Sequence, residues 1–368
     1  MCLAVLFFLL VSQAATGDVA ERFNRAVELH RKGDLAAAET EYRAVLSAAP
    51  QYAQAHANLG ALLMRLDRYQ EALQEYKAAL RLDPKLKPVL LNIGIAHFRR
   101  SEYESAIDSF KRFLQVSPKH AQATQLTALA LVELGRDEEA LTYLEPALEA
   151  APNDPALLYA LGLASLRLRK PMVSGVIKTL AELPGGLAVS YLLQGQANLA
   201  NFQFEKAIED LEQSAKLNPN LPRLHYSLGV AYFKVTRYED SRIALQTALK
   251  RAPNDVSGLC YLASIDEKEG KLDDARRRLN RALLLEPASA DANWLLGKVL
   301  LAQGKAAEAL KPLEAAASGD PNDTQKRYQL ARAYQQLGRK EDAERELAEV
   351  ERIHARQRET DRSKIIKP

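Results

Sequence analysis

Small and large apolar residues recur at fixed positions along this chain, and the pattern is divided by regularly spaced prolines. The first prolines of the series are 34 residues apart, and so are the last ones. Between the two groups the spacing is one residue short of two full periods. The series is Pro50, Pro84, Pro118, Pro152, Pro184, Pro219, Pro253, Pro287 and Pro321. A constant period of this length indicates an array of structural repeats rather than two or three unrelated domains.

Placing each proline at position 32 divides the chain into ten repeats. They begin at Val19, Ala53, Lys87, Ala121, Pro155, Ala188, Pro222, Val256, Ala290 and Thr324. Positions 8 and 20 are Gly, Ala or Ser in every repeat. Position 24 is bulky in nearly all of them, as in Tyr42, Tyr76 and Phe110. Positions 8, 20 and 24 were not used to align the repeats, so their regularity supports the alignment set by the prolines.

Each repeat is predicted to form two helices of about 12–15 residues joined by a tight turn. Small residues at positions 8 and 20 allow the two helix axes to approach closely, and large residues fill the space around that contact. Proline at position 32 ends the second helix. Glycine at position 15 supplies the positive φ that ends the first helix, at Gly33, Gly135, Gly270, Gly304 and Gly338.

These columns resemble the tetratricopeptide repeat family, and the resemblance extends from Val19 to about Gln357. The segment Ala53 to Pro84 alone has the family residues in register, namely Leu59, Gly60, Tyr69, Ala72, Tyr76, Ala79 and Pro84. The resemblance implies an all-α solenoid, a right-handed superhelix of stacked helix-turn-helix repeats. First helices would line a concave groove that binds a peptide or a partner protein.

The array of ten repeats at residues 19–357 has two irregular members. The fifth repeat, residues 155–187, carries Pro171, Gly175 and Gly185 in or beside its second helix. It indicates either a bend between two half-arrays or neutral variation in a tolerant loop. The tenth repeat lacks the closing proline and has a polar second helix, as expected of a cap. Residues 358–368 are expected to be a short basic tail without a fold of its own.

The first 17 residues carry no charged side chain, and Leu3 to Val11 is almost entirely apolar. This pattern predicts a signal peptide in residues 1–15, cleaved near Ala14 or Ala15. No Lys or Arg precedes Leu3, so an N-terminal membrane anchor is the alternative. Export to the periplasm or secretion is expected, with a membrane-anchored or cytoplasmic location as the alternatives.

Composition narrows the class of protein. The chain has 50 Lys and Arg against 47 Asp and Glu, which is too balanced for a protein held on nucleic acid by phosphate contacts. After the N-terminus there is no apolar run of about 20 residues, which disfavours a membrane channel. The only cysteines, Cys2 and Cys260, cannot form a disulfide framework or a thiolate zinc site.

Motifs for catalysis, metal binding and cofactor binding are absent from the sequence. It contains no GxGxxG, GxSxG or HExxH, and its six histidines are not grouped at ligand spacing. Cys260 is interpreted as an apolar filler of a first helix. We therefore expect a protein that is not an enzyme and that has no metal, cofactor or small-molecule substrate.

Two rows of polar residues mark the predicted groove of the first three repeats. Position 6 is Asn24, Asn58 and Asn92, and position 13 is Arg31, Arg65 and Arg99. An amide can pair with any peptide unit, and a guanidinium attracts carboxylates. The asparagine row resembles the ladder of O-linked N-acetylglucosamine transferase, although it stops after three members. Alternatively, the asparagines are tolerated surface residues and the arginines are partners of helix C-termini.

Aromatic residues mark the groove of the second half, at position 5 of three repeats. They are Tyr226, Trp294 and Tyr328. Large aromatic side chains on a groove face are good anchors for a partner. The alternative is that at least half of them only pack between neighbouring first helices.

The sequence thus predicts a non-enzymatic scaffold that binds a peptide or a partner protein in a concave groove. A structural subunit of an envelope, secretion or pilus assembly is one alternative. The other is the recognition subunit of a separately encoded transferase. No nucleic-acid partner is expected. Membrane association is expected only through an uncleaved N-terminus.

Overall fold

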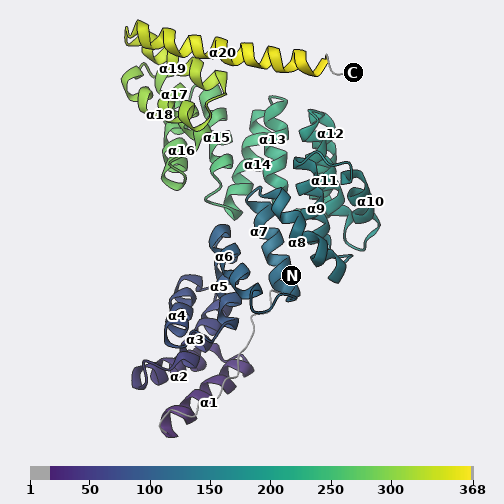
Figure 1. Ribbon diagram of the computed structural model, residues 1–368, viewed down its shortest axis with the longest axis vertical. Helices are drawn as coiled ribbons and strands as arrows, with labels where there is room; N and C mark the ends of the chain where they lie inside the picture. Colours follow the sequence, from purple (N-terminus) through teal and green to yellow (C-terminus); the bar gives the residue numbers. More distant parts are fainter. Residues whose placement is uncertain (1–16, 366–368) are drawn as a thin grey trace. The chain divides into compact units, whose positions relative to one another are not determined.

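The computed structural model describes residues 17–365, which form twenty helices and no strand (Figure 1). Helices come in pairs, one pair for each predicted repeat, and the two helices of a pair pack against each other. The fold is therefore the all-α solenoid of stacked helical hairpins that the sequence predicts. Residues 1–15, where a signal peptide or anchor is expected, lie outside the described residues.

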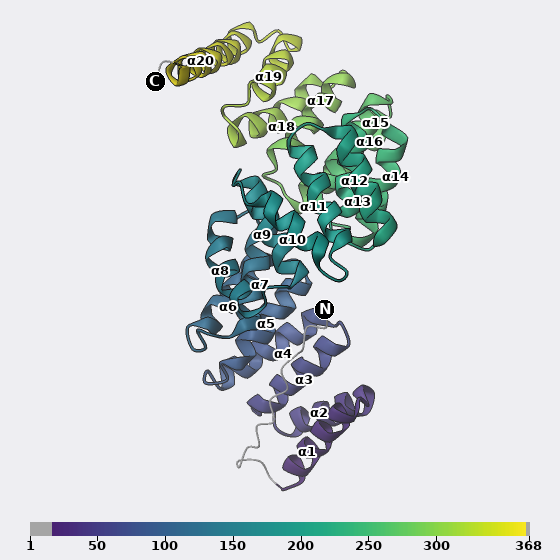
Figure 2. The same ribbon diagram turned by 90° about the vertical axis from the view of Figure 1, so that its right-hand side faces the viewer.

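The chain divides into two compact units, and the division falls between Gly186 and Leu187. The order of the helix pairs within each unit can be followed in Figure 2. The N-terminal unit contains α1 (Gly17–Lys32), α2 (Leu35–Ala48), α3 (Ala53–Arg65), α4 (Tyr69–Leu82), α5 (Pro88–Arg99), α6 (Tyr103–Leu114), α7 (Ala121–Glu133), α8 (Asp137–Ala150), α9 (Pro155–Arg167) and α10 (Val173–Glu182).

The C-terminal unit holds the remaining five pairs. It contains α11 (Leu187–Ala200), α12 (Phe204–Leu217), α13 (Leu224–Lys234), α14 (Tyr238–Arg251), α15 (Val256–Lys268), α16 (Leu272–Leu285), α17 (Ala290–Ala302), α18 (Ala306–Gly319), α19 (Thr324–Gln336) and α20 (Lys340–Ile365). Odd-numbered helices are the first helices of their repeats, and even-numbered helices are the second helices. Most second helices end two residues before the proline at position 32, as expected.

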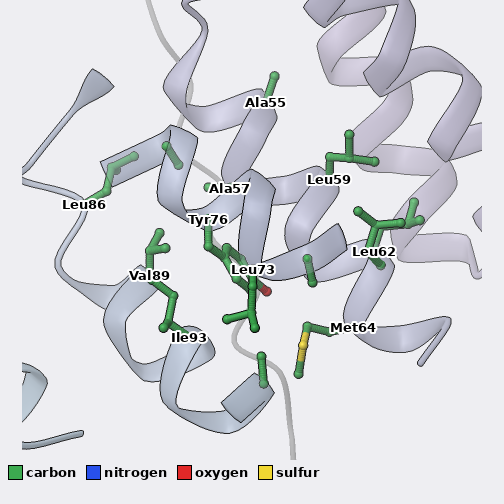
Figure 3. Packing of buried hydrophobic residues seen from close by; sticks show 14 of the residues in the cluster. Ala55, Ala57, Leu59, Leu62, Met64, Leu73, Tyr76, Leu86, Val89 and Ile93 are labelled. Atoms are coloured by element: carbon green, nitrogen blue, oxygen red, sulfur yellow. The ribbon is translucent and has the colours of Figure 1, made fainter. Parts of the chain in front are cut away.

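In the repeats that have glycine at position 8, this glycine lies directly against the bulky residue at position 24. A Cβ at Gly94 would lie 2.4 Å from a ring carbon of Phe110, and one at Gly297 would lie 2.3 Å from Leu313. Figure 3 shows the buried apolar residues around Tyr76, where α4 packs between α3 and α5. The small column therefore exists because a larger residue would collide with the second helix of its own repeat.

Position 15 has a positive φ in all ten repeats. Five of these residues are the predicted glycines, with φ between 71° and 87°. The other five are not glycine, although they adopt the same conformation at φ between 54° and 62°: Asp67, Ser101, Arg169, Phe202 and Thr236. The turn between the two helices therefore has one backbone shape throughout, and half of the repeats form it with a side chain that disfavours it.

The two irregular repeats are visible in the structure. Helix α10 of the fifth repeat has 10 residues, whereas α2, α4 and α8 have 14 each. At the C-terminus, α20 runs on to Ile365, so the expectation of a tail without a fold is wrong for residues 358–365. No glycine or proline interrupts the sequence between Lys340 and Ile365, which explains the long helix. Among residues 17–365, no helix has both the length and the apolar character needed to cross a bilayer.

Candidate partner-binding groove

The backbones of first helices in neighbouring repeats approach each other closely in both units, whereas the backbones of neighbouring second helices do not within the described residues. In a curved array the helices are closest together on the inner side. The first helices therefore line the concave face of each unit. All nine residues predicted to bind a partner lie on first helices.

The three asparagines do not form an exposed row. Asn24 is exposed on α1, but Asn58 and Asn92 are buried, with only 4% and 2% of their surface accessible. The Asn58 side chain faces the Tyr42 hydroxyl of the preceding repeat, close enough to affect its pKa although without ordinary hydrogen-bond geometry. The expectation that these amides are solvated is therefore wrong for two of the three, because each packs against the second helix of the preceding repeat.

Asn92 repeats this arrangement one repeat further on, beside the hydroxyl of Tyr76. Burial raises the pKa of both tyrosines, and the nearby amide partly offsets that rise. The shared position 6 of these two repeats thus supplies a polar neighbour for a buried tyrosine. Replacing the amides would disturb the packing between repeats, so loss of binding in such a variant would not identify a ligand contact.

The three arginines at position 13 are all exposed. Arg65 donates a hydrogen bond to the backbone oxygen of His30, at 3.0 Å, near the C-terminus of the preceding first helix. Arg31 pairs with Glu28 on its own helix, at 3.0 Å. Arg167 repeats the contact of Arg65 by donating to the Val132 oxygen at 2.7 Å. For Arg65 the structure therefore supports the alternative interpretation, a partner for a helix C-terminus.

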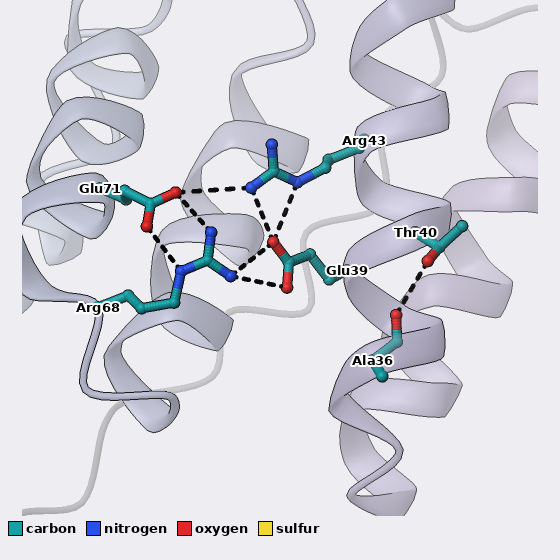
Figure 4. A network of polar contacts seen from close by, with 6 residues as sticks. All are labelled: Ala36, Glu39, Thr40, Arg43, Arg68 and Glu71. Carbon is teal, nitrogen blue, oxygen red and sulfur yellow. Dashed lines mark hydrogen bonds and ion pairs between the residues drawn. The ribbon is translucent and has the colours of Figure 1, made fainter.

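Two clusters of ion pairs that span neighbouring repeats were not predicted from the sequence. Arg68 bridges Glu39 of α2 and Glu71 of α4, and Arg43 joins the same cluster (Figure 4). In the C-terminal unit, buried Asp266 accepts from Arg242 at 2.7 Å and from Arg278 at 2.6 Å. These residues are ordinary charged side chains in the sequence, and the stacking of repeats brings Glu39 to Arg68 and Asp266 to Arg242.

The C-terminal unit contains an open cavity of about 910 Å³ along its first helices, hereafter the C-terminal groove. Tyr226 and Trp294, two of the three predicted aromatic residues, line it. Tyr328 is 52% exposed on α19 and is not part of the lining. The structure thus brings two of the three residues into one site, together with Phe233 and Tyr261, which the sequence analysis missed.

Aromatic rings pack along the floor of this groove. The ring centroids of Tyr226 and Tyr261 are 6.1 Å apart, and those of Phe233 and Tyr261 are 5.3 Å apart. The ammonium of Lys298 lies 4.9 Å from the centroid of the Trp294 ring. The indole nitrogen of Trp294 is buried and has no hydrogen-bond partner among the described residues. Tyr226 therefore packs against a neighbouring first helix and also lines the groove, so the two interpretations of the aromatic row are compatible.

Charged side chains of opposite sign lie at the two ends of the C-terminal groove. Lys234 and Lys268 are the last residues of α13 and α15, and Lys298 follows on α17. At the other end are the carboxylates of Glu286, Asp291 and Asp320. A ligand that lies along the first helices would therefore meet ammonium groups at one end and carboxylates at the other.

Cys260 also lines the groove but offers no reactive thiolate. Burial raises the pKa of its thiol to about 12, and nearby carboxylates, with Asp291 the foremost, act in the same direction. The thiol is therefore protonated at neutral pH. No group of three or more His, Cys, Asp or Glu side chains within the described part of the chain is placed to hold a metal ion.

Stacked helical hairpins with an open groove define a class of protein, the helical-repeat solenoid with an extended interaction surface. A family model described as Cilia and flagella-associated protein 70 middle TPR-like domain matches residues 19–212. Models described as Tetratricopeptide repeat or TPR repeat match residues 195–235, 222–255, 262–324 and 300–359. The chain belongs to the tetratricopeptide repeat family.

Two curated relatives carry names that describe their context. Cellulose synthase operon protein C of Xanthomonas axonopodis pv. citri is 27% identical over 249 residues, which cover 63% of this chain and 16% of the relative. Anaphase-promoting complex subunit 3 of Schizosaccharomyces pombe is 25% identical over 151 residues, covering 41% and 23%. The chain therefore spans less than a quarter of the length of these two relatives.

Solved structures with the same fold are more distant in sequence. The APC/C hetero-tetramer Cut9-Hcn1 contains a chain that matches with a TM-score of 0.60 at 15% identity, over 91% of this chain and 80% of that one. A human IFIT1 dimer with PPP-AAAA matches with a TM-score of 0.52 at 16% identity, over 93% and 92%. At these identities the similarity shows the shared solenoid fold alone.

Proposed function

We propose that this protein is a non-enzymatic scaffold that binds an extended segment of a partner protein in the C-terminal groove. The observation that carries the proposal is the part-exposed aromatic floor, with Tyr226 and Trp294 lining a cavity of about 910 Å³. Trp and Tyr are the residues that most often dominate binding energy at interfaces, at about 2 kcal/mol or more each.

The first experiment locates the partner on the surface by photo-crosslinking in the native cell. A photoreactive residue at Ser264, inside the groove, is compared with one at Ile243, which is 56% exposed on second helix α14. We expect a specific crosslinked protein at Ser264 and not at Ile243. Crosslinks at Ile243 alone would show that the partner binds elsewhere.

A matched pair of substitutions tests the aromatic anchors. Trp294→Ala should abolish the crosslink at Ser264, whereas Phe202→Ala should leave it unchanged. Phe202 is an aromatic residue that is 80% exposed in the turn before α12, and it does not line the groove. Equal loss in both variants would mean that the groove aromatics have no special role. Unchanged crosslinking in Trp294→Ala would contradict the proposal.

A structural subunit of a larger assembly is the second candidate. It is supported by the name of one similar protein, a subunit of the anaphase-promoting complex. Both candidates give a crosslink in the groove, and they differ in lifetime. A single stoichiometric partner that survives purification favours the structural subunit, whereas several transient partners favour the peptide-binding scaffold.

Export to the periplasm belongs to the same proposal. It rests on the apolar segment before Gly17 in the sequence. Intact-mass measurement of the protein from its native host tests it. A mature product that begins near Thr16 is expected, and a cytoplasmic product that begins at Met1 would contradict it.

A further inference from the structure

The two ends of the C-terminal groove are built from opposite ends of the first helices. Lys234 and Lys268 end α13 and α15, while Asp291 lies in the first turn of α17. Glu286 and Asp320 are the C-caps of the second helices α16 and α18, which return the chain to that same edge. We call the lysine end the basic rim and the carboxylate end the acidic rim.

The basic rim has free charge to offer a ligand. The ammonium of Lys298 forms an ion pair with Glu267, at 3.6 Å, and also lies over the face of the Trp294 ring. Lys234 and Lys268 form no ion pair with the described side chains. Glu267 is the carboxylate of the lining at this end, so ammonium groups outnumber carboxylates there.

The buried ammonium of Lys326 partly neutralises the acidic rim, but two of the carboxylates there stay exposed. The ammonium of Lys326, whose side chain is only 6% exposed, lies 2.9 Å from Asp291, 3.2 Å from Asp320 and 3.3 Å from Asp323. Three carboxylates thus share one buried cation. The Asp291 and Asp320 side chains remain 75% and 48% exposed, so they can also contact a ligand cation.

The length of a first helix sets the separation of the rims along the helix axis. Asp291 is at position 2 of its repeat, and Lys234 and Lys268 are at position 13 of theirs. Eleven residues of helix span roughly 16 Å at about 1.5 Å per residue. An extended peptide covers that distance in about five residues. The aromatic floor lies between the rims.

We propose that the C-terminal groove recognises an extended peptide segment with a cationic side chain and an anionic one about five positions apart, flanking an apolar or aromatic residue. The segment lies along the first helices, with its cation at the acidic rim and its anion at the basic rim. This inference rests on the proposed function and adds the chemical class of the partner. Charge complementarity of this kind gives specificity more than affinity.

A helix C-terminus attracts cations such as Lys234 and Lys268, and a helix N-terminus attracts anions such as Asp291, so these three charges could serve the first helices alone. A change of specificity distinguishes the two roles, because stabilisation of a helix cannot select among peptides. The probes are four peptides with blocked ends: SKSLYSDS, SQSLYSNS, SKSLYSKS and SDSLYSDS. They share length and aromatic residue and differ only in the two charged positions.

Binding is measured by fluorescence anisotropy with the full chain at low salt. We expect SKSLYSDS to bind about three- to tenfold more tightly than the uncharged peptide, because each exposed ion pair contributes roughly a 1.5- to fivefold change. The advantage should shrink in 0.5 M salt. The two peptides with charges of one sign should bind no better than the uncharged one.

Reversing the basic rim should invert this order. In the double variant Lys234→Glu, Lys268→Glu, SKSLYSKS becomes the tightest ligand, since both rims are then acidic. The control is Lys216→Glu, Lys250→Glu, which makes the same change in the last turns of second helices α12 and α14. It should keep the order of the unmodified protein.

The outcomes separate this inference from the proposed function. Peptide binding that depends on Trp294 but ignores peptide charge would overturn the rims and leave the groove as the binding site. An unchanged order in the double variant would have the same meaning. No binding of any peptide at about 1 mM would overturn both.

Discussion

Gly60 lies against the ring of Tyr76 so closely that a Cβ at Gly60 would be 2.6 Å from Cε1 of the tyrosine. The tyrosine is fully buried, so it has no free space into which to move. The closest approach of α3 and α4 therefore depends on a missing methyl group. The same relationship recurs between Gly94 and Phe110 and between Gly229 and Leu245.

Gly60→Ala should therefore destabilise the array even though alanine favours helix. The matched control is Gly175→Ala in α10, where a new Cβ would meet nothing within 4 Å. Both changes gain about 1 kcal/mol of helix propensity, whereas overpacking at Gly60 costs about 1–3 kcal/mol. Urea unfolding should show Gly60→Ala to be the less stable variant by roughly that cost. Equal midpoints would refute the packing argument.

Thr236→Gly should stabilise the C-terminal unit. Thr236 is a β-branched, exposed residue at φ 62°, a conformation that costs roughly 1–2 kcal/mol relative to its preferred ones. Gly270 occupies the equivalent position at φ 75° without that cost. Thermal unfolding should show a higher midpoint for Thr236→Gly and a lower one for Gly270→Thr. A lower midpoint for Thr236→Gly would contradict the assigned turn.

Asp266→Asn should cost the C-terminal unit roughly 3 kcal/mol. Asp266 is only 1% exposed and binds two guanidinium groups, so its loss leaves Arg278 without its carboxylate and Arg242 with Glu269 alone. Asp274→Asn is the control, because its pair with Arg277 is exposed and should contribute less than about 1 kcal/mol. Chemical denaturation compares the two. Similar small effects would mean that the buried cluster does not join the repeats.

His30 should make the N-terminal unit sensitive to acid. Burial lowers the pKa of this imidazole from 6.5 to about 4, with a further lowering by Arg65. Between those values the unfolded chain binds the proton and the folded chain does not, so stability falls as pH falls from about 6.5 to 4.

Methionine occupies the equivalent position 12 of the next repeat, as Met64. His30→Met should therefore fold. Between pH 7 and pH 4.5 its free energy of unfolding should fall by about 2 kcal/mol less than that of the unmodified protein. Urea midpoints at the two pH values give the answer. Parallel losses in both proteins would show that His30 is not the responsible group.

Helix α10 should open before the rest of the N-terminal unit. It buries only Val176 and Leu180, whereas α4 buries Ala72, Leu73, Tyr76 and Ala79. Local stability follows buried apolar contact. Hydrogen exchange should be faster across residues 173–182 than across residues 69–82. Equal protection of the two segments would refute this prediction.

The sequence alone determined the repeat, its two helices and its turn. Position 8, position 24 and the closing proline act within a single repeat, over a few turns of helix, so their pattern survives in one dimension. The glycines at position 15 even predicted the backbone shape of the turn. They did not predict that Thr236 or Phe202 would adopt it too, because there the stacking of helices overrides the preference of the residue.

Only the tertiary structure decided what faces the groove. Asn24, Asn58 and Asn92 share one position of the repeat, yet the last two are buried beside tyrosines of the preceding repeat, whereas Asn24 is exposed on α1. Asp266 and Arg242 meet across neighbouring repeats, and so do the lysines of the basic rim. Burial and charge pairing depend on which repeat stacks next, and the side chains there are set by residues about 34 positions away. A periodic pattern therefore determines the helices and turns of each repeat, whereas each contact between repeats depends on the particular pair that stacks together.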